Sequence, residues 1–116
     1  GDISVTPVRV EHATVETYGY VFRADGRSFG YVPDIKRLPE DSAPLLTGLD
    51  ALAMDGLCFP EHHTHLTVDQ NIALMRRLAP RLGYVTHSGH RLDYDELAAY
   101  LPDFMSPAYD GLRVDL

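Results

Sequence analysis

The residues of this chain best suited to metal binding or proton transfer are its histidines and one aspartate. The six histidines are His12, His62, His63, His65, His87 and His90. All six fall in segments predicted to be loops or strand ends, and none lies in the middle of a periodic apolar face. A neutral imidazole is both a good metal ligand and a proton carrier near pH 7. A single histidine is more often a solvated or structural residue, so a functional assignment depends on how the six are arranged.

Three candidate ligands follow predicted strands, at three distant points of the sequence. They are His12 after Val10, Asp34 after Pro33, and His87 after Thr86. A carboxylate has two oxygens and can bridge two cations, which an imidazole cannot. A set of two imidazoles and one carboxylate suits zinc or manganese. The alternative for Asp34 is a turn aspartate that accepts hydrogen bonds from nearby backbone N–H groups.

A second histidine-rich segment precedes a predicted helix. It reads Pro60-Glu61-His62-His63-Thr64-His65. The segment has three interpretations: an exposed polar loop, a tract that binds metal adventitiously, or the source of a general acid that protonates a leaving group. Residue spacing alone does not choose among them.

The elements that must position these side chains are strands first, and then strands that alternate with helices. We predict strands over residues 3–10, 18–24, 28–32, 51–54, 84–86 and 109–116. Asp25-Gly26 between two β-rich runs indicates a hairpin. Pro7 removes a backbone donor, so the first strand belongs at an edge or carries a bulge. The segment from Asp55 to Leu66 is interpreted as loop.

Three helices are expected between the later strands. Ser42 is the predicted cap of a short helix that runs through Leu49. Thr67 and Gln70 have the spacing of a capping box, for a helix that Pro80 ends. Asp93 and Glu96 repeat that spacing, for a helix from Tyr94 to about Leu101. Sheets and helices in this order pack in layers, with ligands bound where the strands end.

Composition excludes several classes of function. The 116 residues are 45% hydrophobic and 23% charged, which suits one folded domain or part of one. A net charge of -7 argues against a large nucleic-acid partner. No apolar run approaches the roughly 20 residues that cross a bilayer. The single Cys58 forms no internal disulfide, suits a cytoplasmic location, and is interpreted as a small buried hydrophobe.

The ordered set of motifs resembles the C-terminal half of a metallo-β-lactamase-fold hydrolase. More narrowly, it is similar to the branch of phosphoribosyl cyclic phosphate phosphodiesterases and their bacterial relatives. The matching pieces are Glu11-His12, Tyr18-Gly19-Tyr20, Tyr31-Val32-Pro33-Asp34, His62-His63-Thr64-His65, Thr86-His87-Ser88-Gly89-His90 and Ala108-Tyr109-Asp110-Gly111. The resemblance implies an α/β (α+β) fold: half of an αββα sandwich over residues 1–116, with a mixed β-sheet and about three helices on one face.

The resemblance also implies a role for each site residue. His12 binds one metal ion, Asp34 bridges two, and His87 binds the second. His65 matches the histidine that acts at the scissile phosphate. Supporting or substrate contacts are expected from His62, His90, Tyr109 and Asp110. The implied cofactors are two divalent ions, zinc or manganese, and the implied substrate is a small cyclic phosphate or related phosphodiester.

The defining motif of that fold, His-x-His-x-Asp-His, is absent from these residues. Catalytic zinc needs about three protein ligands, so we expect this chain alone to lack a complete two-metal centre and to be inactive. A larger parent protein is the favoured source of the missing N-terminal half, and a separate chain is the alternative. One half alone leaves an apolar sheet face in water, so association with the missing half or with a second copy is expected.

Two rival functions remain at this stage. The same fold hydrolyses RNA ends and thioesters, and a relative in quinone-cofactor biosynthesis is also compatible, because fold does not select among these. From a different class, the chain is a non-catalytic interaction module whose histidines no longer bind metal. Metal analysis of the purified protein separates the last alternative from the others.

Overall fold

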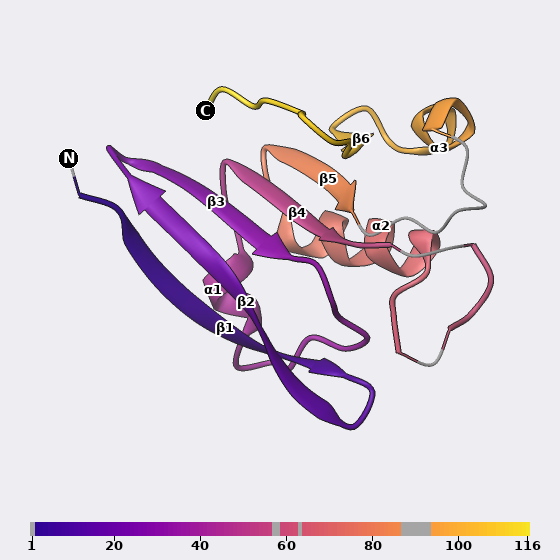
Figure 1. The fold of residues 1–116 in the computed structure, drawn as a ribbon, viewed down its shortest axis with the longest axis horizontal. Helices are drawn as coiled ribbons and strands as arrows, with labels where there is room; N and C mark the ends of the chain where they lie inside the picture. The colour runs from indigo at the N-terminus through magenta and orange to yellow at the C-terminus, as the bar shows by residue number, and fades with distance from the viewer. Residues whose placement is uncertain (1, 57–58, 63, 87–93) are drawn as a thin grey trace.

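A computed structural model describes residues 2–56, 59–62, 64–86 and 94–116. It contains a six-stranded mixed sheet in the order β1-β2-β3-β4-β5-β6 and three helices (Figure 1). The strands are β1 Ser4–His12, β2 Val15–Ala24, β3 Arg27–Val32, β4 Ala51–Asp55, β5 Leu82–Thr86 and β6 Met105–Pro107. The helices are α1 Ala43–Leu46, α2 Val68–Leu78 and α3 Tyr94–Tyr100. The predicted α+β class with a mixed sheet is confirmed.

The first three strands form an antiparallel meander built by tight turns. Asp25 and Gly26 join β2 to β3, and both have positive φ angles, 53° and 74°. Two positive φ angles are what a two-residue hairpin turn requires, and Asp-Gly tolerates them. β1 is an edge strand, with Pro7 paired in register with Tyr20. Both the hairpin and the edge position of the proline-containing strand are confirmed.

The strands β3, β4, β5 and β6 run parallel to one another. β1 and β3 are each antiparallel to β2, so β1 runs in the same direction as the parallel strands. The carboxyl ends of five strands therefore meet at one edge of the sheet. Because His12 ends β1 and Asp55 ends β4, this edge collects polar side chains that are far apart in the sequence.

One face of the sheet packs against the helices. Figure 1 shows α1 and α2 behind the sheet and α3 beside β6. All three helices contribute to a single hydrophobic cluster, which includes Leu46, Met75, Leu78 and Leu97 from the helices and Val8, Val10, Val21, Val32, Leu52, Met54 and Val85 from the strands. Alternation along the strands directs these side chains to the same face. This buried layer fixes the strands whose ends carry the polar residues.

The opposite face of the sheet is aromatic. We call Tyr18, Tyr20, Phe22, Phe29, Tyr31 and Tyr84 the aromatic face. Phe29 stacks against Phe22 at 6.2 Å and against Tyr31 at 6.5 Å between ring centroids. Tyr18, Tyr20 and Tyr31 are each more than 40% exposed. Tyr20 and Tyr31 are paired across β2 and β3, so exposed aromatic side chains lie side by side on this face.

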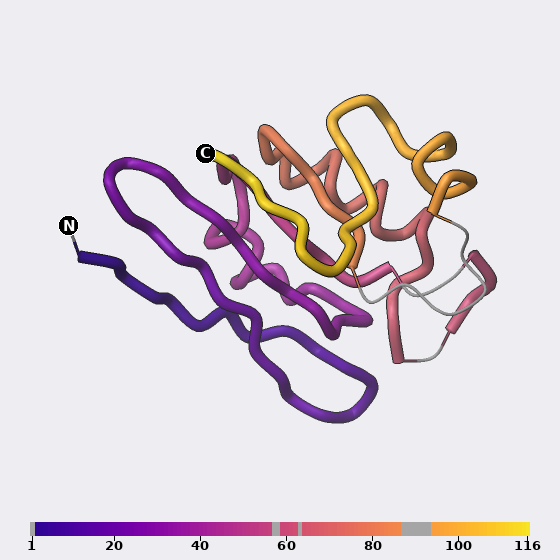
Figure 2. The backbone as a smooth tube through the Cα atoms, turned by 45° about the horizontal axis from the view of Figure 1, so that its top comes forward, coloured from indigo at the N-terminus to yellow at the C-terminus, as the bar shows by residue number. Residues whose placement is uncertain are grey.

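The C-terminal segment crosses part of this face without joining the sheet. Figure 2 shows it passing in front of the strands, and Leu112 and Val114 line a cavity of about 200 Å³ together with Phe29, Tyr31 and Tyr84. The prediction of a strand over residues 109–116 is wrong, since β6 is the last strand of the described chain. Gly111, with a φ of 86°, lies in the turn that follows β6, where the chain leaves the sheet edge.

Thr67 and Ser42 stand at the N-caps of α2 and α1 as predicted, but α1 ends at Leu46, short of the predicted Leu49. In α2 the Gln70 backbone N–H donates to the Thr67 hydroxyl at 3.1 Å and the Thr67 N–H donates to the Gln70 side chain at 3.0 Å. Ser42, by contrast, donates its hydroxyl to the Arg9 carbonyl at 2.7 Å and makes no capping bond. Tertiary contact with β1 thus replaces the local cap. Asp93, of the third predicted cap, lies outside the described residues.

None of the helices in the described ranges has the length and apolar character of a segment that spans a bilayer.

Candidate functional site

Three side chains converge at the carboxyl edge of the sheet. One ligand atom each from His12, Asp34 and His65 lies within 4.8 Å of the other two. All three residues are partly buried. His12 ends β1, Asp34 follows β3, and His65 lies shortly before α2. The structure therefore brings together two of the predicted metal ligands and the predicted proton donor.

The end of β1 is tied to the segment that follows Asp34. Glu11 and Arg37 exchange backbone hydrogen bonds of 3.0 and 3.1 Å and form an isolated antiparallel bridge. Their side chains also pair twice, with Arg37 Nε 2.5 Å from Glu11 Oε2 and Nη2 2.9 Å from Oε1. The hydrogen bond from Arg37 lowers the pKa of Glu11. This double clamp holds the neighbouring His12 beside the Asp34 segment.

The carboxylate of Asp55 lies directly behind His65. Asp55 is fully buried, and its Oδ2 is 2.5 Å from His65 Nδ1. The same oxygen accepts a hydrogen bond from the Ile35 N–H at 3.1 Å. The other ring nitrogen of His65, Nε2, is 3.3 Å from His12 Nε2. Sequence reasoning missed Asp55 by assigning it to a loop, although a carboxylate directly after a buried apolar run was an available signal.

The donor set fits a divalent cation. Two nitrogens bound to one tetrahedral zinc at 2.0–2.1 Å stand about 3.3 Å apart, which is the separation between the His12 and His65 Nε2 atoms. Two imidazoles and a carboxylate, without a thiolate, also suit manganese. The same 3.3 Å separation allows a direct hydrogen bond between the rings. Two roles are therefore compatible with the position of His65: it is a third metal ligand, or it is a proton donor next to the ligands.

An ion pair joins the segment after Asp34 to the segment before His65. Lys36 Nζ is 2.5 Å from Glu61 Oε1, and Gln70 donates to the other oxygen of Glu61 at 2.8 Å. The hydrogen bond from Lys36 lowers the pKa of Glu61. Because Lys36 and Glu61 carry opposite charges, their contact joins the two segments without adding net charge there.

The remaining predicted site residues are less closely grouped. The His62 ring lies 5.3 Å from the His65 ring between centroids, and its Nδ1 accepts from the Thr64 N–H at 3.2 Å. Tyr109 packs edge-to-face on Tyr94 at 5.9 Å, and Asp110 is exposed. The residues His63, His87 and His90, together with Cys58, lie outside the described residues. Their predicted roles stay predictions.

Comparison with known proteins gives a consistent picture of the fold. The family model described as the Beta-lactamase superfamily domain matches residues 1–88. No curated protein matches the sequence. Among solved structures, a diphosphatase from the PhnP family is 34% identical, with a TM-score of 0.92 over 98% of this chain and 44% of the diphosphatase.

Two more distant structures share the fold alone. Human tRNase Z, short form, is 16% identical with a TM-score of 0.74, over 95% of this chain and 40% of that protein. Zn²⁺-bound PqqB from Methylobacterium extorquens is 22% identical with a TM-score of 0.75, over 98% of this chain and 47% of PqqB. The chain therefore spans less than half the length of each of these structures.

Proposed function

Because the chain belongs to the β-lactamase superfamily, we propose that it supplies half of the active site of a metal-dependent phosphodiesterase. The substrate is a small cyclic phosphate or a related phosphodiester. The observation that carries the proposal is the convergence of His12, Asp34 and His65 at one edge of the sheet. The 34% identity to a PhnP-family diphosphatase supports phosphoester chemistry over the other reactions of the superfamily.

In the complete site, His12 and Asp34 would hold one divalent ion, and Asp34 and His87 a second. The remaining ligands would come from a segment with the His-x-His-x-Asp-His motif, either in a longer parent protein or in a partner chain. Zinc and manganese are the proposed ions. When bound, such a pair supplies an activated water and neutralises charge that develops on the phosphoryl oxygens.

The proposed role of His65 is to protonate the departing oxygen. Its Nδ1 faces Asp55, so Nε2 is the atom that faces the cluster and delivers the proton. Asp34 would fix the cations. A general acid held in place contributes about 10²- to 10⁴-fold to the rate.

Metal content and hydrolysis together test this function. The complete protein, joined to or mixed with its N-terminal half, is expected to bind zinc or manganese and to hydrolyse bis(4-nitrophenyl) phosphate and a five-membered cyclic phosphate. The present chain alone is expected to do neither. A thioester or a β-lactam serves as the comparison substrate. Metal binding with hydrolysis of the thioester only would overturn the phosphodiesterase assignment, and absence of metal from the complete protein would favour an interaction module.

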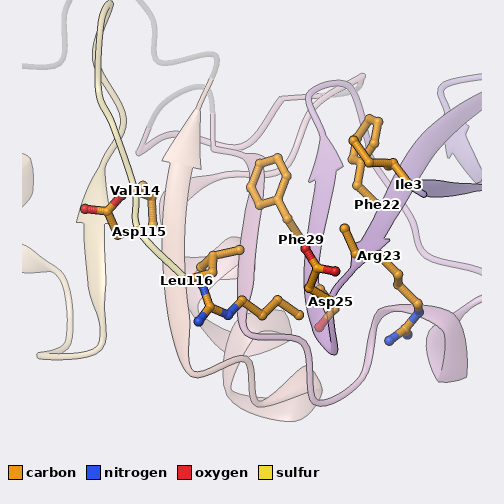
Figure 3. A pocket seen from close by; sticks show the side chains of 11 residues that line it. Ile3, Phe22, Arg23, Asp25, Phe29, Val114, Asp115 and Leu116 are labelled. Atoms are coloured by element: carbon orange, nitrogen blue, oxygen red, sulfur yellow. The ribbon is translucent and has the colours of Figure 1, made fainter. Parts of the chain in front are cut away.

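The aromatic face is the proposed contact surface for the missing half or for a second copy of the chain. An open cavity of about 420 Å³ lies at the end of this face away from His12, between Ile3, Phe22, Phe29 and Leu116 (Figure 3). The cavity and the exposed Tyr20 and Tyr31 present apolar surface. Burial of this surface in an interface would stabilise the complex by roughly 25 cal/mol per Å². The net charge of -7 makes a large nucleic acid an unsuitable partner. A cytoplasmic location is proposed from the single cysteine.

Replacement of Tyr20 and Tyr31 together by lysine should abolish this association. Both side chains project from the aromatic face, and two ammonium groups would have to lose water on docking. Size-exclusion chromatography with light scattering measures the change. The control is Leu45→Lys, which places a lysine at a comparably exposed site on α1, behind the sheet. A wild-type chain that stays strictly monomeric and does not bind its N-terminal half would refute the proposal.

A further inference from the structure

Asp55 is a fully buried carboxylate at the carboxyl end of β4. The run before it, from Ala51 to Met54, is entirely apolar and buried. Transfer of an ionised carboxylate into such surroundings is costly unless hydrogen bonds and a positive partner offset it. An aspartate therefore persists at this position only where its contacts need a carboxylate, and those contacts identify what it does.

One oxygen of Asp55 makes contacts to two parts of the candidate site. Oδ2 lies 2.5 Å from His65 Nδ1 and accepts the Ile35 N–H at 3.1 Å. Ile35 directly follows Asp34. We propose that Asp55 is a positioning residue that fixes both the ring of His65 and the backbone next to Asp34. This inference rests on the proposed function for its catalytic consequence, but its structural part can be tested independently.

The backbone around Asp55 is itself held on two sides. The buried Asn71 of α2 donates its side-chain amide to the carbonyl of Asp55 at 2.7 Å and to that of Met54 at 3.0 Å. The Gly56 N–H donates to the Thr86 carbonyl at 3.1 Å, and a Cβ atom at Gly56 would lie 2.6 Å from a methyl of Val85. The end of β4 therefore has little freedom to move, so the Asp55 carboxylate is held in one position.

The contact to Nδ1 determines which nitrogen of His65 faces the site. A carboxylate oxygen accepts, so the Asp55 contact requires the proton of the ring to be on Nδ1 in the neutral histidine. Nε2, which lies 3.3 Å from His12 Nε2, is then the nitrogen that takes up a second proton, and the resulting imidazolium is the form that can donate that proton to a leaving group. Without Asp55, the ring can rotate and exchange tautomers. In such a variant we expect the His65 ring to be present, but with Nε2 no longer held toward the cluster.

The tautomer of His65 can be measured in the metal-free 116-residue chain, with no substrate. Long-range ¹H–¹⁵N spectra of the histidine rings are expected to show His65 with its proton on Nδ1 in the wild type. Asp55→Asn is expected to shift the proton to Nε2, because the amide can donate to Nδ1 as well as accept. The matched control is Asp50→Asn, at the opposite end of β4, where the carboxylate accepts from the Ser28 N–H at 2.8 Å.

The spectra are decisive even if Asp55→Asn does not fold. A wild-type His65 with its neutral proton on Nε2 would overturn the proposal without any variant. So would an Asp55→Asn chain that is folded and keeps the wild-type tautomer. These outcomes do not depend on activity, so a failure of the proposed phosphodiesterase function is distinguishable from a failure of the Asp55 assignment.

Kinetics of the complete enzyme then test whether positioning matters for turnover. Loss of a carboxylate behind a working histidine costs about 10- to 100-fold. We expect Asp55→Asn to lower kcat by that factor on an alkyl phosphodiester and much less on the 4-nitrophenyl ester, whose leaving group needs no protonation. In the His65→Ala background, Asp55→Asn should have no further effect on kcat. Additive effects of the two substitutions, or an equal loss on both substrates, would show that Asp55 does not act on turnover by positioning His65.

Discussion

Asp34→Ala is expected to empty the metal site of the complete protein and to abolish its hydrolysis. Asp34 supplies the one carboxylate of the converging set, and a carboxylate alone can bridge two cations. Removing it therefore deprives both proposed ions of a ligand. The loss in kcat/KM should exceed the roughly 10- to 100-fold typical for residues that only support a ligand. Elemental analysis after dialysis and assay of 4-nitrophenyl ester hydrolysis measure both effects.

Asp41→Ala is the matched control for this experiment. Its carboxylate is 80% exposed and forms a long ion pair with Arg9 at 3.5 Å, so metal content should be unchanged. Excess zinc or manganese should restore little activity to Asp34→Ala, because the bridge is missing rather than weakened. Retention of both ions by Asp34→Ala would assign Asp34 to the turn-stabilising role that its position also allows.

His65→Ala is expected to lower kcat by about 10²- to 10⁴-fold while the metal content stays close to that of the wild type. His65 faces the cluster through Nε2 but is held from behind by Asp55, an arrangement suited to proton donation. The loss should be largest for alkyl esters and smallest for the 4-nitrophenyl ester, whose departing oxygen needs no proton.

Metal analysis of the same variant decides whether His65 is a metal ligand or a proton donor. If His65→Ala loses an ion in proportion to its loss of activity, the 3.3 Å separation from His12 reflects two ligands on one cation. The roles proposed for His65 and for the ligand set would then have to be exchanged. A uniform loss on both substrates would point in the same direction.

The convergence of His12 with Asp34 could be predicted from sequence because strand ends are easy to find. An apolar run followed by a polar residue marks where a strand leaves the core, and in this sheet β1 and β3 share a direction. His65 required the family resemblance, since the loop spacing of the segment before α2 gives no orientation. The roles implied for His87 and His90 stay predictions.

Long-range contacts explain what the sequence did not reveal. Asp55 looks like the first residue of a loop until β4 is seen in register with β5, where Asp55 pairs with Thr86. The alternation of Leu112, Val114 and Leu116 is strand-like, yet these residues lie outside the sheet. Local pattern indicates which face of a segment is apolar, and the partner that covers that face has to be found in three dimensions.

The paired backbone bonds between Glu11 and Arg37 link the edge hairpin to the loop after β3. Chain termini and loops open more readily than the core of a protein, and His12 lies at the end of the N-terminal edge strand. The Glu11–Arg37 bridge and the hydrogen bond from Ile35 to Asp55 connect the backbone segments that carry His12, Asp34 and His65. Local opening of the β1–β2 hairpin would therefore displace all three side chains together. If the proposed ion is bound there, we expect its release to require separation of the end of β1 from the segment that follows β3.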